Sequence, residues 1–158
     1  GLVGSEMCIR DRFKRVFEVN FFGIVNCIHA LLPKCEKNTQ LVIIDSMARL
    51  LPFTRSEAYG ASKAAVHYLT QSLSVDLRAK GVIVQSVSPG FVETPLTDKN
   101  DFEMPMKITA EEAAETLLKR IEAKQMAIYF PNVFGWILRI LNHLPQRIKR
   151  WLSSKLQQ

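Results

Sequence analysis

Two short apolar runs constrain the fold of this chain most strongly. Residues 41–45 read LVIID and residues 82–87 read VIVQSV, and turn-forming residues bound both runs. Continuous apolar runs of this length are typical of strands buried in a parallel sheet. A helix is predicted between them over about residues 56–80, and Gly81 follows it as a C-terminal glycine should. This order predicts a βαβ unit with a right-handed crossover, and therefore an α/β fold.

Helix and strand patterns continue on both sides of this unit. Apolar residues recur at helical spacing over residues 13–32, with Asn20 on the same stripe. Thr109 and Glu112 form a capping box that begins a further helix. Residues 126–130, MAIYF, read as a last strand. The chain is therefore predicted to form three parallel strands with flanking helices, followed by amphipathic helices.

Three polar side chains are predicted to meet at the carboxyl end of the first strand, where sheets of this kind bind ligands. Ser46 ends that strand, and Tyr59 and Lys63 share one face of the next helix because they are four residues apart. A free phenol has a pKa of about 10, and a nearby ammonium favours the phenolate. Tyr59 is therefore predicted to be the acid or base. Ser46 would hydrogen-bond the substrate oxygen, and Lys63 would tune Tyr59 and bind a cofactor hydroxyl.

A Tyr and a Lys at this spacing also occur as an ordinary solvated pair, which is the commoner case for the pair alone. The surrounding pattern favours the catalytic interpretation. Small residues flank Tyr59, Ser46 precedes it at a strand end, and residues 88–90, Ser-Pro-Gly, are predicted to break the second strand sharply. His67 lies one turn after Lys63 and is interpreted as a helix-surface or interface residue, because the chemistry already has its proton donor.

Together these motifs resemble the short-chain dehydrogenase/reductase family, which carries an Asn, Ser, Tyr, Lys tetrad on a Rossmann-type fold. Residues 19–23, VNFFG, match the family's VNxxG context, and residues 89–94, PGFVET, match its loop with PG and Thr. The likeness covers about residues 13–130. It implies an NAD(P)-dependent oxidoreductase that interconverts a secondary alcohol and a ketone, or an alcohol and an aldehyde. The catalytic residues that it implies are Asn20, Ser46, Tyr59 and Lys63.

The resemblance also implies which residues bind each ligand. The residues implied for NAD or NADP are Tyr59, Lys63, Pro89, Gly90, Val92 and Thr94. The backbone of Val92 and the hydroxyl of Thr94 would hold the nicotinamide carboxamide, whereas Ser46 and Tyr59 would contact the substrate. In the family the Asn binds backbone and holds a water that links the Lys to solvent. From the residues alone, Asn20 is a buried amide that needs a partner, and the two interpretations are compatible. No metal is implied.

Residues 95–108 lie where the family has a mobile substrate lid. Phe102, Met104 and Met106 are the predicted pocket-lining residues there. These apolar residues, with those of the tail, indicate a lipophilic small-molecule alcohol or carbonyl substrate. In the family the helices that correspond to those of Asn20 and Tyr59 pack against their copies, which implies a homodimer or tetramer of the full-length protein.

The family's Gly-rich turn for the pyrophosphate is the main departure from its pattern. None of the seven glycines belongs to a TGxxxGxG motif. Since such a turn and its helix N-terminus hold the pyrophosphate, we expect this chain to bind a dinucleotide poorly and to be inactive as it stands. Two alternatives stay open, namely a non-catalytic dimerisation or membrane-surface module and an inert fragment.

Three regions are expected along the chain. Residues 1–12 fit neither a signal peptide nor the family and are interpreted as a non-native leader. Residues 13–130 would be the C-terminal part of a Rossmann-type domain, and residues 131–158 a tail with five basic residues and no acid. Basic amphipathic helices with Trp suit an anionic membrane surface, although this tail is too interrupted to span a membrane. It could equally dock on the protein's own substrate cleft or on a partner subunit.

Composition limits the setting of the protein. Its 158 residues suffice for one domain, and 47% hydrophobic and 23% charged residues are ordinary for a soluble globular chain. Cys8, Cys27 and Cys35 form no CxxC and no metal-type spacing, which indicates a reduced, cytoplasmic setting, peripheral on a membrane if the tail binds one. The formal net charge is +6, but no nucleic-acid-binding motif accompanies it, so no nucleic-acid partner is expected.

Overall fold

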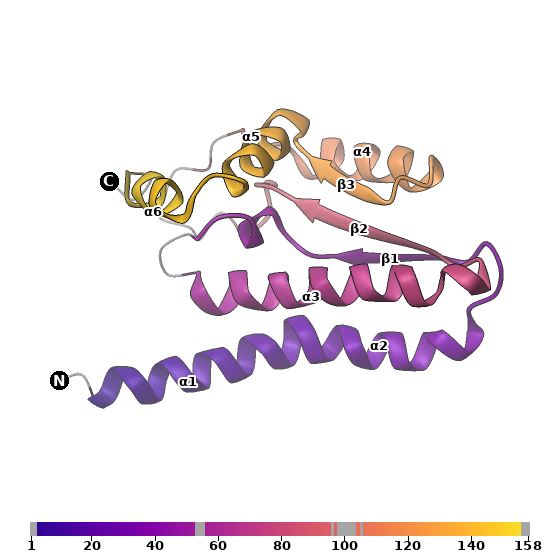
Figure 1. Cartoon of the computed structure of the whole chain (residues 1–158), viewed down its shortest axis with the longest axis horizontal. Coiled ribbons are helices and arrows are strands. Elements are labelled where there is room, and N and C mark those ends of the chain that lie inside the picture. Colours follow the sequence, from indigo (N-terminus) through magenta and orange to yellow (C-terminus); the bar gives the residue numbers. More distant parts are fainter. Residues whose placement is uncertain (1–2, 53–55, 96, 98–103, 105, 156–158) are drawn as a thin grey trace.

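The computed structural model describes residues 3–52, 56–95, 97, 104 and 106–155. Within them the chain forms a parallel sheet with helices on both faces (Figure 1). The strands are β1 (Gln40–Ile44), β2 (Ile83–Pro89) and β3 (Ala127–Phe130), paired in the order β1-β2-β3. Helix α3 (Glu57–Asp76) lies between β1 and β2 in the chain, and α4 (Ala110–Glu122) precedes β3. The predicted α/β fold with three parallel strands is confirmed.

A long helical stretch covers the outer side of α3 (Figure 1). It consists of α1 (Val3–Phe17), a π-helical segment η1 (Glu18–Phe22), α2 (Gly23–Leu31) and a 3₁₀ turn η2 (Leu32–Lys34). The apolar spacing predicted this helix from residue 13, whereas it begins ten residues earlier at Val3. The expected leader of residues 1–12 is thus largely helical, and its separation from the domain stays a prediction.

By length and composition alone, residues 9–34 of this stretch could cross a membrane, which is weak evidence by itself. In the structure one side of the stretch packs on the domain. Ile28 joins the buried core that contains Val66 of α3, and Phe21 and Ile24 pack against the same core.

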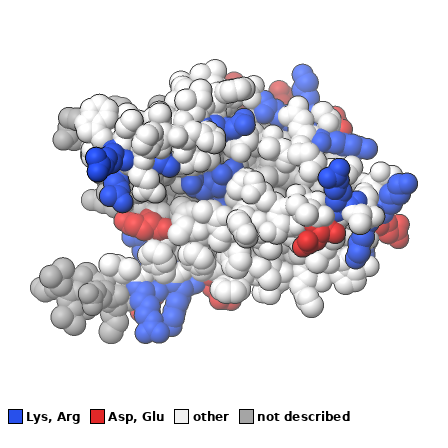
Figure 2. All heavy atoms as spheres, viewed as in Figure 1, with Lys and Arg blue, Asp and Glu red and all other residues white. Residues whose placement is uncertain are grey.

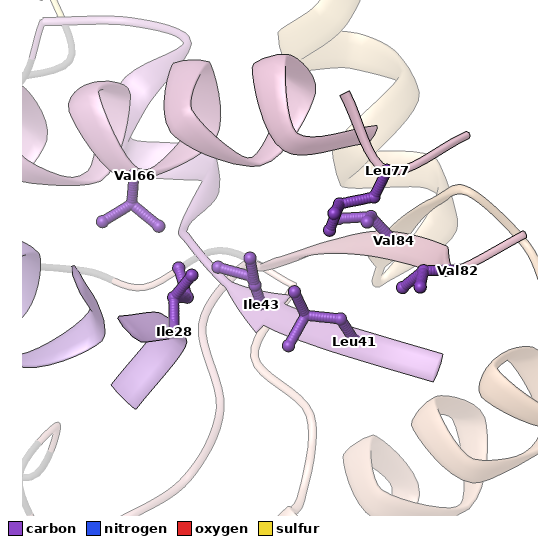
Figure 3. Packing of buried hydrophobic residues seen from close by; sticks show 7 residues of the cluster. All are labelled: Ile28, Leu41, Ile43, Val66, Leu77, Val82 and Val84. Atoms are coloured by element: carbon purple, nitrogen blue, oxygen red, sulfur yellow. The ribbon is translucent and has the colours of Figure 1, made fainter. Parts of the chain in front are cut away.

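Side chains on the α3 face of the sheet change from apolar to polar toward the carboxyl ends of the strands. Leu41 and Ile43 of β1 and Val84 of β2 pack with Val66 in the core (Figure 3). Since alternate residues of a strand share a face, Asp45 follows Leu41 and Ile43, and Ser86 and Ser88 follow Val84. All three of these polar residues are buried. The fold therefore collects polar groups at the edge of the sheet where the site was predicted.

Two predicted boundaries differ from the observed ones. Strand β2 continues through Ser88 and Pro89, so the sharp break comes only at Gly90. Pro89 has no amide proton to donate, but the pairing with β3 continues past it, because the Gly90 amide donates to the Phe130 carbonyl at 2.8 Å. Helix α3 ends at Asp76 rather than residue 80, and a 3₁₀ turn η4 (Arg78–Lys80) follows it. Gly81 then has a φ of 70°, as expected for a C-terminal glycine.

The C-terminal elements cover the other face of the sheet and its carboxyl edge. The capping box of α4 is confirmed, since Thr109 and Glu112 each accept a hydrogen bond from the other's amide. Helices α5 (Asn132–Asn142) and α6 (Gln146–Lys155) follow β3. They flank Pro145, as the tail pattern predicted.

Candidate active site

Ser46 lies in a tight turn directly after β1. Its hydroxyl accepts a hydrogen bond from the Ala48 amide at 3.1 Å and so caps the 3₁₀ turn η3 (Met47–Arg49). The start of α3 fits closely on this turn, because a Cβ added at Gly60 would lie 3.2 Å from the Ala48 carbonyl oxygen. A glycine beside Tyr59 thus lets the tyrosine's turn of helix approach the Ser46 turn.

Tyr59 and Lys63 lie together near the end of β1, as predicted. The Lys63 Nζ is 5.8 Å from the centre of the Tyr59 ring and donates to the Ile44 carbonyl at 3.3 Å. Tyr59 is 41% exposed. Burial lowers the pKa of Lys63 below its ordinary value, and the negative charge of Asp45 acts against this change. Lys63 therefore holds its proton less tightly than a solvated lysine does.

Asn20 lies in the π-helical segment and contacts the same turn of α3. Its Nδ2 donates to the Ser62 hydroxyl at 3.1 Å, and Ser62 Oγ in turn donates to the Tyr59 carbonyl at 2.7 Å. Single π-helical turns inside α-helices are frequent at functional sites. The structure thus joins Asn20 to the helical turn that carries Tyr59 and Lys63, through a hydroxyl rather than through backbone directly.

The loop after β2 carries Val92 and Thr94, two of the residues predicted to bind the cofactor. Val92 forms an isolated bridge with Ile108 that uses the Phe91 carbonyl and the Glu93 amide, so neither backbone group of Val92 takes part in it. The Val92 carbonyl accepts from Thr97 Oγ1 at 2.8 Å.

Thr97 also pairs with Thr94, and their hydroxyl oxygens lie 3.2 Å apart. Sequence reasoning missed Thr97, although its spacing of three from Thr94 is typical of a hydroxyl-stabilised turn.

Gly90 provides close packing at the start of this loop. A Cβ there would lie 3.0 Å from Cδ1 of Phe134 in α5. Helix α5 also buries Phe134 and Leu138 against Met47, Leu50 and Leu51 of the Ser46 turn and the chain after it. The tail therefore covers the segments that follow both β1 and β2.

Part of the predicted substrate lid lies outside the described residues. Phe102 belongs to this part, which the structure does not describe. Met104 is half-buried and Met106 is 47% exposed with a φ of 57°. Their role in lining a pocket stays a prediction.

A buried cluster around Asp45 is the main feature that the sequence reasoning missed. His67 was interpreted as a surface or interface residue, but its side chain is only 16% exposed and its Nδ1 lies 2.7 Å from Asp45 Oδ2. Arg49 Nε lies 3.2 Å from the same oxygen. The available signals were the helical spacing of Lys63 and His67 and the alternation that places Asp45 on the α3 face.

Comparison with known proteins agrees with this geometry. A family model described as short chain dehydrogenase matches residues 3–105. The chain belongs to the short-chain dehydrogenase family. An uncharacterized oxidoreductase of Staphylococcus epidermidis is 36% identical over 110 residues, which cover 68% of this chain and 48% of that protein. An uncharacterized oxidoreductase of Myxococcus xanthus is 32% identical over 148 residues, which cover 92% of this chain and 55% of that protein.

A solved structure shows the same fold. It is a short chain dehydrogenase from Burkholderia cenocepacia in complex with NADP, with a TM-score of 0.74 and 24% identity. The match covers 90% of this chain and 59% of that one. The chain thus spans about half the length of the two curated relatives.

Proposed function

We propose that the protein encoded by the complete reading frame is an NAD(P)-dependent oxidoreductase that interconverts a secondary alcohol and a ketone, or an alcohol and an aldehyde. The observation that carries this proposal is the meeting of Tyr59, Lys63 and the Ser46 turn at the carboxyl end of β1. Ligands bind at this edge in sheets of this kind. Membership of the short-chain dehydrogenase family supports it.

Each residue of the tetrad has a separate task in the proposed reaction. In the reduction direction, Tyr59 Oη gives its proton to the carbonyl oxygen while the carbonyl carbon receives a hydride, so one O–H and one C–H bond form. Ser46 donates a hydrogen bond to the same oxygen as negative charge develops there. The Lys63 ammonium favours the phenolate that Tyr59 becomes. Asn20, through the Ser62 hydroxyl, holds the turn of α3 that carries both residues.

A nicotinamide cofactor supplies or accepts the hydride when it is bound. The Val92 amide, which the bridge to Ile108 does not use, suits the oxygen of a carboxamide, whereas the Val92 carbonyl accepts from Thr97. Thr94, Pro89 and Gly90 would border the ring, and Tyr59 and Lys63 would reach a ribose hydroxyl. NAD and NADP are both compatible with these residues.

The substrate and assembly of the protein are part of the same proposal. Exposed apolar groups occur in the predicted lid, where Met106 is 47% exposed, and in the tail, where Trp136 is 63% exposed. They favour a lipophilic alcohol or carbonyl compound. Exposed apolar side chains on the helical layer, among them Val19 and Phe22 of η1 and Val75 of α3, support a homodimer or tetramer. A cytoplasmic enzyme that is peripheral on a membrane fits these features and the tail.

A second function, contact with an anionic membrane surface, is favoured by the two faces of α5. One face packs on the domain through Phe134 and Leu138. The opposite face of α5 carries exposed apolar side chains, and α6 adds two more. Together they form an outer stripe of Val133, Trp136, Ile137 and Ile140 from α5 and Ile148 and Trp151 from α6. Basic side chains lie over α6 beside it (Figure 2). An apolar face with Trp and flanking basic residues is typical of helices that lie in a membrane interface.

Transfer of deuteride tests the proposed activity most simply. NADH and NADPH carrying deuterium at C4 are incubated with the protein and a panel of lipophilic ketones and aldehydes. We expect deuterium on the carbinol carbon of the product alcohol, measured by mass spectrometry. No transfer from either nucleotide, together with no nucleotide binding by calorimetry, would leave a non-catalytic module as the better account.

A further inference from the structure

Asp45 has an environment unlike that of an ordinary strand-end residue. Its side chain is fully buried. Oδ2 accepts hydrogen bonds from Arg49 Nε at 3.2 Å, from Ser86 Oγ at 2.9 Å and from His67 Nδ1 at 2.7 Å. Oδ1 accepts a short hydrogen bond from Ser88 Oγ. A carboxylate can only accept, so all four neighbours act as donors to it.

The cluster joins several of the elements around the proposed active site. Asp45 extends β1, and its amide donates to the Val87 carbonyl of β2 at 2.8 Å. Arg49 ends the 3₁₀ turn after Ser46, and its Nη2 donates to the hydroxyl of Tyr129 in β3 at 2.9 Å. His67 belongs to α3, one turn after Lys63. One carboxylate therefore links three strands, the Ser46 turn and the helix of Tyr59.

Stability alone does not explain a buried charge of this kind. Burying a carboxylate and a guanidinium carries a large desolvation cost, and well-packed apolar residues often replace such pairs without loss of stability. A fully satisfied polar network does fix one arrangement of its parts. In this cluster the network fixes the Ser46 turn against α3 and the sheet.

Asp45 holds two groups of the proposed site. The ion pair from Asp45 to Arg49 spans Ser46 and closes the turn in which Ser46 caps η3. The Ile44 carbonyl accepts from the Lys63 ammonium at 3.3 Å, and Asp45 Oδ2 contacts His67, one turn after Lys63 on the same helix. Lys63 and the Asp45 carboxylate thus both belong to the junction of β1 and α3, where burial lowers the pKa of Lys63 and the Asp45 charge acts against this change. The other titratable or charged groups around Lys63 are Tyr59 and His67 on the same helix and Arg49 on the turn.

We propose that Asp45 is a positioning residue of the active site, whose carboxylate fixes the Ser46 turn and keeps Lys63 in its ammonium form. This inference rests on the proposed function for its catalytic meaning. The electrostatic effect on Lys63 does not depend on turnover and can be measured separately.

The direct test follows the protonation of Lys63 by NMR, with lysines labelled at the ε-carbon and the Lys63 resonance assigned by its loss in Lys63→Arg. In Asp45→Asn we expect this resonance to titrate at lower pH than in the wild type, by about one unit or more, because an opposing charge has been removed. Tyr129→Phe is the matched control, since it removes one hydrogen bond from Arg49 and keeps the carboxylate. An unchanged titration in Asp45→Asn overturns the proposal.

A second variant covers the case in which Asp45→Asn does not fold, because that change leaves Arg49 buried without its counter-charge. The double variant D45N/R49Q removes both charges and keeps polar groups of similar size. Its reference is R49Q alone, because the two variants differ only in the Asp45 carboxylate, and the Lys63 resonance is expected to titrate at lower pH in D45N/R49Q than in R49Q. Equal Lys63 titrations in these two folded variants also overturn the proposal.

The pH profile of alcohol oxidation connects this effect to catalysis. Alcohol oxidation needs Tyr59 as the phenolate beside protonated Lys63. The alkaline limb of the pH profile is therefore expected to move to lower pH in Asp45→Asn. In Tyr129→Phe the alkaline limb is expected to stay in place. A profile unmoved by Asp45→Asn contradicts the catalytic role. If the wild type shows no turnover, the proposed function fails, while the NMR titration still decides whether Asp45 sets the charge of Lys63.

Discussion

Lys63 combines a proposed catalytic task with a cost to stability, and the second gives a prediction with a defined sign. Burial lowers its pKa below the ordinary 10.5, so the unfolded chain binds more protons than the folded one between the two values. Wild-type stability relative to Lys63→Met therefore rises as pH increases through that window. At pH 7 we expect Lys63→Met to unfold at a higher temperature than the wild type, and the gap to narrow toward pH 10.5. Turnover should fall by about 10²-fold or more.

Thermal unfolding followed by circular dichroism at a series of pH values measures this gap. Lys80→Met is the control, because it removes an exposed ammonium of η4 and leaves Lys63 unchanged. A gap for Lys63→Met that widens with pH would show that the Lys63 charge is favoured, not disfavoured, in the folded state.

At this scale the sequence could predict the residues whose relation is local. Ser46 ends an apolar run, and Tyr59 and Lys63 share one helical face, so both relations follow from short spacing. The partners of Asp45 could not be predicted in the same way. Ser88 and Tyr129 come from β2 and β3, and only the register of the sheet brings them to the end of β1.

Two glycines in helices are expected to respond oppositely to the same change. A Cβ at Gly135 of α5 would lie 2.8 Å from Tyr129 Cβ and 3.0 Å from Met47 Cε. Gly135→Ala should therefore push α5 away from β3 and the Ser46 turn, at a cost of about 1–3 kcal/mol in unfolding free energy. A Cβ at Gly23 of α2 would meet only Glu18 O at 3.7 Å, so Gly23→Ala should stabilise by up to about 1 kcal/mol.

Urea unfolding midpoints of the two variants and the wild type measure both effects. An unchanged midpoint in Gly135→Ala would mean that α5 does not pack as closely as described, and a lower midpoint in Gly23→Ala would contradict the open space at Gly23. Loss of activity in Gly135→Ala is also expected, since Met47 follows Ser46.

Most elements could be predicted because each carries its own signal, as the capping box at Thr109 and the apolar run of β3 do. The packing of α5 on the Ser46 turn could not be predicted from the sequence. Phe134 and Leu138 show a helical stripe, but the stripe does not say which surface it covers. The predicted end of β2 was also wrong. Pro89 was expected to break the strand because it has no amide proton, but it pairs with Phe130 as the last residue of β2.

For the whole molecule, the outer stripe of the tail predicts selective binding to anionic lipid. The protein should float with vesicles that contain phosphatidylglycerol and not with pure phosphatidylcholine, and high salt should weaken this binding. Trp136→Ser with Ile140→Ser should abolish flotation, since both side chains are exposed and apolar. Tyr68→Ser with Val75→Ser is the matched control, because these α3 side chains are equally exposed and lie outside the tail.

Flotation that survives the loss of Trp136 and Ile140 would contradict this account. If the same change instead alters the oligomer size by light scattering, the stripe contacts another protein chain rather than lipid.

The measurement that tests the central claim most directly is turnover by Tyr59→Phe in the protein encoded by the complete reading frame. The change removes only the hydroxyl that donates the proton. We expect kcat to fall by about 10²–10⁴-fold with NAD(P)H binding retained. Tyr68→Phe on the same helix, with a side chain 74% exposed, should keep full activity. Wild-type turnover by Tyr59→Phe would contradict the assignment of Tyr59 as the acid and base of the reaction.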